Sequence, residues 1–118
     1  CWTAISDSNL ENGGIWVLPR SHKWGVLEHE NEEPNQQVYG GLRAKCSDYS
    51  GAVPVEMKAG QVAIFSSLTL HMSGPNTSRN SMRRGYVPQY HVPGVILKKT
   101  GKPVGDQFPV LRDGLRVS

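Results

Sequence analysis

The stretch GQVAIFSSLTLHMSGPN, residues 60–76, indicates the fold most clearly. It holds two short apolar runs, residues 61–65 and 68–71, and it ends in the turn residues Gly74, Pro75 and Asn76. Another apolar run lies at residues 53–57, and only Lys58-Ala59-Gly60 separates it from the run at residues 61–65. Short strands joined by a glycine-containing turn are typical of a hairpin, so we expect residues 53–57 to pair with residues 61–65.

Further strand-like runs lie on both sides of this stretch, at residues 2–5, 15–18 and 83–92. The turn-rich residues 7–14 separate the first two runs, and Pro19 ends the second before a polar loop at residues 20–23. The acidic residues 26–37 show no periodicity and predict a surface loop or short helix, or alternatively a lid over a site. Many short β segments without a helical period indicate an all-β barrel or sandwich.

Composition sets limits on the class of protein. The chain has 118 residues, of which 37% are hydrophobic and 19% are charged, so it can form one domain with a core. It contains no apolar run of about 18 residues and no signal-peptide pattern, so we expect no membrane span and a cytoplasmic setting. The basic residues are scattered, so we expect no nucleic-acid partner. Cys1 and Cys46 are expected to be plain thiols.

His71 is the first candidate site residue. It ends an apolar run just before a turn, a position from which a metal ligand held by a strand can face a cavity. The alternative is a hydrogen-bonded structural histidine, which the pattern alone favours over a metal ligand.

Arg83 and Arg84 are adjacent, so strand alternation places their side chains on opposite faces and only one can point inward. An inward arginine needs an anionic partner, and its fork suits the bidentate binding of a small dicarboxylic acid. The alternative is that both arginines are solvated surface cations.

Three segments together resemble the phytanoyl-CoA dioxygenase family of iron(II)- and 2-oxoglutarate-dependent oxygenases. They are residues 2–4 followed by NGGIWVLPRSHK (12–23), GQVAIF (60–65) leading to HMSGPNTS (71–78), and RRGY (83–86). The resemblance implies a double-stranded β-helix, a cupin-like jelly-roll barrel. Residues 1–92 would form the C-terminal portion of this barrel, and residues 93–118 a loop-rich extended tail that packs on it.

The resemblance also implies roles for individual residues. His71 matches the distal iron-binding histidine, Arg83 the arginine that binds the far carboxylate of 2-oxoglutarate, Ser73 a hydroxyl beside it, and Trp2 an aromatic residue of the cosubstrate pocket. The turn before the arginine is one residue longer than is usual in the family, so Arg84 is the alternative clamp.

Two further expectations follow for the site. The small Gly85 beside an inward Arg83 is expected to leave space for a short dicarboxylate. The His-x-Asp motif, which supplies the other two iron ligands in the family, is absent from these 118 residues.

The expected function is therefore hydroxylation of a small organic substrate, with the chain a fragment that is inactive alone. The alternative is a non-catalytic β-sandwich module for binding or oligomerisation. Because a partial barrel exposes strand edges, a homodimer is also expected.

Overall fold

A computed structural model of the protein describes residues 1–31, 42–105 and 108–117. Its contacts divide the chain into two units, Cys1–Pro88 and Gln89–Ser118. The assignment of the first part to a barrel stays a prediction. The second unit holds one small antiparallel sheet, made of β9 (Leu111–Arg112) and β10 (Leu115–Arg116).

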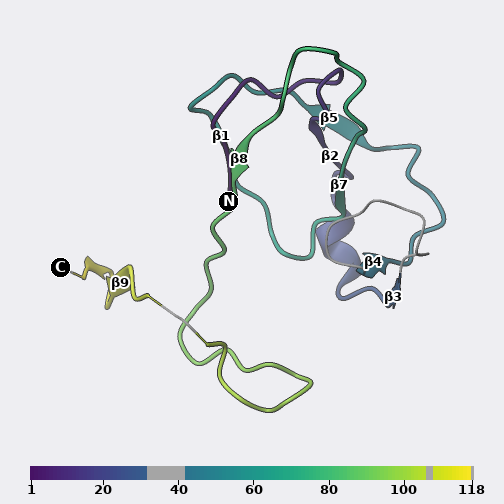
Figure 1. Ribbon diagram of the computed structural model, residues 1–118. Coiled ribbons are helices and arrows are strands. Elements are labelled where there is room, and N and C mark those ends of the chain that lie inside the picture. Colours follow the sequence, from purple (N-terminus) through teal and green to yellow (C-terminus); the bar gives the residue numbers. More distant parts are fainter. Residues whose placement is uncertain (32–41, 106–107, 118) are drawn as a thin grey trace. The chain divides into compact units, whose positions relative to one another are not determined.

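The first unit contains two three-stranded antiparallel sheets (Figure 1). One has strand order β6-β1-β8, with β1 at Trp2–Ala4, β6 at Val62–Ala63 and β8 at Gly85–Tyr86. The other has order β5-β2-β7, with β2 at Ile15–Val17, β5 at Val53–Val55 and β7 at His71–Ser73. A separate two-stranded sheet joins β3 (His29–Asn31) to β4 (Leu42–Ala44).

The expected all-β class is confirmed, since the only helix among the described residues is the short 3-10 helix η1 (Ser21–Trp24). That helix replaces the polar loop expected at residues 20–23. No helix in the described ranges has the length and apolar character that a membrane crossing requires.

The core joins the two three-stranded sheets. Period-two alternation buries Trp2 and Ala4 of β1, and Ile15 of β2 packs in the same cluster together with Met57. Burying a large apolar side chain contributes roughly 1.5–3 kcal/mol. This small cluster therefore holds the strands that carry the candidate site residues.

The expected hairpin of residues 53–57 and 61–65 is wrong. β5 pairs with β2, and β6 pairs with β1, so these neighbouring segments lie in different sheets. Met57 forms a bridge with Ser8 between them, through two backbone hydrogen bonds of 2.8 Å. A local turn signal does not specify the partner of a strand, because each short strand gains more by pairing with a central strand above the shared core.

Three other boundaries differ from expectation. The strand predicted at residues 83–92 is only Gly85–Tyr86, because Pro88 has no N–H to donate to a ladder. The strand predicted at residues 68–71 instead begins at His71. Within the predicted loop 26–37, His29–Asn31 is a strand paired with Leu42–Ala44, and residues 32–37 lie outside the described part of the chain.

Candidate functional site

Arg83 lies on the core-facing side of the chain where it enters β8. Gly85 pairs with Ala4, and Trp2 lies on the same face of β1. Arg83, two residues before Gly85, shares that face, and its guanidinium carbon lies 5.3 Å from the centroid of the Trp2 ring. A guanidinium over an indole face is attracted by the ring quadrupole.

Gly85 does not provide the space expected for a dicarboxylate. A Cβ atom at Gly85 would lie 2.5 Å from Cζ2 and 2.7 Å from Cε2 of Trp2. The indole itself therefore fills the volume next to Gly85. The expectation is wrong because the neighbouring strand β1 places its largest side chain there.

Arg83 also contacts the second sheet. Its Nη2 donates a hydrogen bond of 3.2 Å to Oγ of Ser73 on β7. Ser73 pairs with the buried Ile15, so its side chain lies on the same face of the sheet as Ile15, at a position where Ser73 itself is exposed. Arg84, by contrast, is exposed and belongs to the opposite face of the strand. Of the two arginines, Arg83 is the one that meets both Trp2 and Ser73.

His71 shares the face of Ser73, two residues away on β7. Its Nδ1 lies 2.8 Å from the carbonyl oxygen of Thr69, and its ring centroid is 4.9 Å from that of Phe65. A carbonyl oxygen only accepts, so Nδ1–H is the donor of this contact, and in a neutral ring the lone pair then lies on Nε2. This is the tautomer that a metal ligand with a backbone carbonyl partner adopts.

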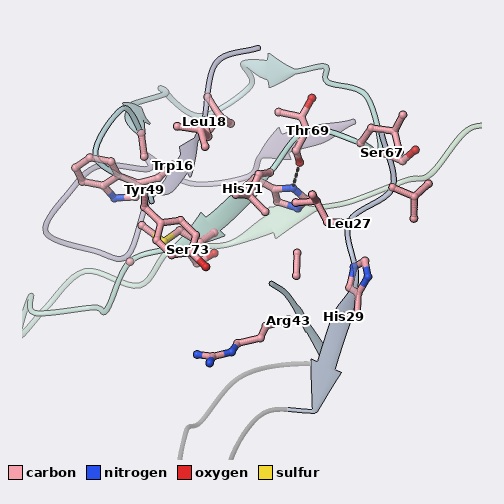
Figure 2. A pocket seen from close by; sticks show the side chains of 18 of the residues that line it. Trp16, Leu18, Leu27, His29, Arg43, Tyr49, Ser67, Thr69, His71 and Ser73 are labelled. Atoms are coloured by element: carbon pink, nitrogen blue, oxygen red, sulfur yellow. Dashed lines mark hydrogen bonds between the residues drawn. The ribbon is translucent and has the colours of Figure 1, made fainter. Parts of the chain in front are cut away.

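His71, Ser73 and Arg83 line one pocket of about 970 Å³. Figure 2 shows this pocket with His71 and Ser73 labelled. Its other lining residues include Leu27, His29, Arg43 and Tyr49, which the sequence did not indicate as site residues. His29 and Arg43 lie on β3 and β4, whose pairing no short motif predicts. Trp2 is not a lining residue and is connected to the pocket through Arg83.

The loop between β7 and β8, which carries Arg83, is held by the buried Asn12. Its Nδ2 donates to the carbonyl of Asp7 at 2.8 Å and to Oγ of Ser81 at 3.0 Å. Gly13, with φ of 83°, lies against the backbone of Gly74, since a Cβ added at Gly13 would be 2.9 Å from the carbonyl oxygen of Gly74. The turn residues before β2 are therefore a support for the segment that leads to the arginine.

Within the described ranges, no group of three or more histidine, cysteine, aspartate or glutamate side chains could hold a metal ion. His71 therefore stays a candidate for one of the three ligands that the family resemblance implies. The residues fit the carboxylate-binding part of the expected site better than they fit a complete iron site.

A family model and several curated proteins match most of this chain. The family model of phytanoyl-CoA dioxygenase (PhyH) matches residues 1–85. A phytanoyl-CoA dioxygenase domain-containing protein 1 homolog of Dictyostelium discoideum is 33% identical over 84 residues, covering 68% of this chain and 30% of the relative. Phytanoyl-CoA dioxygenase of Arabidopsis thaliana is 31% identical over 80 residues, covering 68% of this chain and 28% of the relative.

A dioxygenase of Aspergillus aculeatus, aneA, is 33% identical over 82 residues, covering 70% of this chain and 23% of the relative. No solved structure gives a significant match. The chain therefore belongs to the phytanoyl-CoA dioxygenase family, and it spans less than a third of the length of these curated relatives.

Proposed function

We propose that this chain forms part of an iron(II)- and 2-oxoglutarate-dependent oxygenase that hydroxylates a small organic substrate. Its two three-stranded sheets are proposed to be a portion of a double-stranded β-helix, the jelly-roll barrel. Membership of the family supports this proposal. The observation that carries it is the hydrogen bond from Arg83 to Ser73, because Ser73 lies on the same strand and the same face as His71.

Arg83 is proposed to bind the far carboxylate of 2-oxoglutarate. Its guanidinium has five N–H donors in a planar fork, and the contact with Ser73 is made by one of its two terminal nitrogens. The contact with the Trp2 ring restricts the position of the fork, and the Ser73 hydroxyl beside it can donate to the same carboxylate.

His71 is proposed to be one iron ligand, through Nε2. When bound, iron would activate dioxygen, with 2-oxoglutarate as the cosubstrate that is oxidised and loses carbon dioxide, for attack on an unactivated carbon, and the protein would supply position and a partly apolar pocket. A facial triad needs two further protein ligands. The 118 residues contain no His-x-Asp or His-x-Glu string, so we propose that these ligands come from polypeptide outside this sequence.

The test compares the chain alone with a chimera in which the part of the Dictyostelium relative that precedes the match is placed before Trp2. Manganese(II) replaces iron, because it binds similar ligands without consuming oxygen. We expect manganese(II) and 2-oxoglutarate to bind together to the chimera and not to the chain alone, as measured by calorimetry and electron paramagnetic resonance.

Arg83→Ala in the chimera should weaken 2-oxoglutarate at least tenfold, the effect of losing about 1.4 kcal/mol, while the matched control Arg84→Ala leaves it unchanged. Equal losses in both variants would contradict the role of Arg83. A folded chimera that binds neither ligand would instead support the non-catalytic binding or oligomerisation module.

A further inference from the structure

Ser21 is one of the most deeply buried polar side chains in the described part of the protein, with 1% of its surface exposed. It is the first residue of η1, directly after the turn that ends β2. Its Oγ donates to the carbonyl oxygen of Leu18 at 2.7 Å and accepts from the N–H of Leu70 at 2.8 Å. The hydroxyl therefore uses both its donor and an acceptor site within the protein.

The N–H of Leu70 and the carbonyl of Thr69 belong to one planar peptide group. The N–H end of this group is held by Ser21, and the carbonyl end accepts the Nδ1 proton of His71 at 2.8 Å. The carbonyl of Leu70 in turn accepts from the N–H of Leu18 at 2.9 Å. The backbone immediately before His71 is thus fixed on both sides of Leu70.

These contacts form one continuous chain of donors and acceptors. His71 Nδ1–H donates to the Thr69–Leu70 peptide, the peptide donates to Ser21, and Ser21 donates to Leu18. All three bonds run in the same direction, so each polarises the next and strengthens it. The peptide cannot rotate without breaking the bond at its other end.

We propose that Ser21 is a positioning residue for His71, acting through the Thr69–Leu70 peptide to keep the proton on Nδ1 and the lone pair on Nε2. That the Nε2 lone pair binds a metal ion rests on the function proposed above. The positioning itself does not, because it concerns the ring of His71 in the chain without metal.

Ser6 offers a matched control. Its Oγ likewise donates to a carbonyl, that of Met82 at 3.0 Å, and accepts from a backbone N–H, that of Arg84 at 2.8 Å. It ties a loop to a strand in the same way but has no bond to the peptide before His71. A merely structural role of a bridging serine should therefore show equally in both positions.

The experiment measures the ratio of the two neutral tautomers of His71 by long-range proton-nitrogen NMR of the 118-residue chain near pH 8, where an ordinary imidazole is neutral. We expect mainly Nδ1–H in the unaltered chain. Ser21→Ala should lower the ratio of Nδ1–H to Nε2–H by up to about twofold, because the lost bond acts on the His71 contact only by polarising the peptide group between them. Ser21→Thr, which keeps the hydroxyl, should restore it, and Ser6→Ala should leave it unchanged.

An unchanged ratio in folded Ser21→Ala, or an equal drop in Ser6→Ala, would overturn the proposal. If Ser21→Ala does not fold, Ser21→Cys takes its place, because a thiol fills the site but is a weak hydrogen-bonding group; an unchanged ratio there overturns the proposal as well. In the manganese(II)-binding chimera, a tautomer shift without weaker metal binding would support the positioning role and reject His71 as a ligand.

Discussion

The guanidinium of Arg83 lies over the indole ring of Trp2, with 5.3 Å between its central carbon and the ring centroid. Trp2 is buried in the core and so cannot move aside easily. The buried ring therefore limits where the guanidinium can lie, and such a cation–π contact stabilises by about 0.5–2 kcal/mol depending on exposure. The position of the arginine fork is therefore coupled to the packing of β1 against β8.

Gly85→Ala is expected to destabilise the protein by about 1–3 kcal/mol, because the new methyl group overlaps the Trp2 ring in a packed site. The ring atom nearest to the added carbon would be only 2.5 Å away. Urea unfolding measures the loss, and tryptophan fluorescence reports the displaced ring. Gly105→Ala is the control, since an added Cβ there meets nothing within 4 Å. Equal stability of both variants would contradict this packing.

Asn12→Ala should lower the free energy of unfolding by about 2–3 kcal/mol, because the three hydrogen bonds of a buried side chain are lost at once. Asn12 is 2% exposed and accepts from the N–H of Asn9 in addition to its two donated bonds. The control Asn80→Ala alters an exposed side chain in the β7–β8 loop and should change stability by less than about 0.5 kcal/mol. A similarly small effect at Asn12 would count against the proposed support of the arginine loop.

Arg20→Gly should stabilise the protein by about 0.5–1 kcal/mol. Arg20 precedes η1 with φ of 69° and ψ of −3°, a left-handed conformation that is unfavourable for a residue with a Cβ. Glycine removes this strain and loses part of the gain through the entropy of the unfolded chain. Arg20→Ala keeps the strain and should not stabilise. The melting temperatures of the two variants decide the matter, and a gain in Arg20→Ala alone would refute the explanation.

The contribution of Asp7 to stability should depend on pH. A hydrogen bond from Lys58 and a second from the N–H of Ala59, both 2.9 Å, lower the pKa of the Asp7 carboxyl. Because the pKa of Asp7 is lowered in the folded state, its carboxylate stabilises the protein above the ordinary pKa, about 3.9. This stabilisation is lost as the pH falls through the folded-state pKa.

The difference in melting temperature between the unaltered chain and Asp7→Asn should therefore be constant from pH 7 to about pH 5 and shrink below about pH 4. Because the ion pair is exposed, the difference should be small and should decrease in about 1 M salt. A difference that grows as the pH falls would contradict this assignment.

Self-association through strand edges is expected for the chain alone. β6 and β8 are the outer strands of the β1 sheet, and they expose Val62 and Tyr86. An exposed edge with apolar side chains pairs readily with another copy, and lysine on an edge opposes such pairing. Light scattering after gel filtration should show a dimer that Val62→Lys converts to a monomer. The exposed Val92 lies outside the named strands, so Val92→Lys should have no such effect, and a monomeric unaltered chain would disprove the expectation.

The sequence by itself indicated the all-β class, the family and three of the residues that line the pocket, His71, Ser73 and Arg83. Short apolar runs between glycine, proline and asparagine turns carry the class, because period two and turn chemistry are local properties. The order of three motifs carries the family, which the match over residues 1–85 confirms. The same alternation places Arg83 and Arg84 on opposite faces, but it does not say which face is buried.

Only the tertiary structure decided that question and the pairing of the strands. Arg83 is the inward arginine because β8 pairs with β1 in the register that places Gly85 on the Trp2 face. Residues 53–55 and 62–63 lie in different sheets, and Ser21 meets the peptide before His71, although no local signal connects them. Strand partners and buried hydrogen bonds are chosen by the burial of distant side chains in one core, and this choice is made by the whole chain at once.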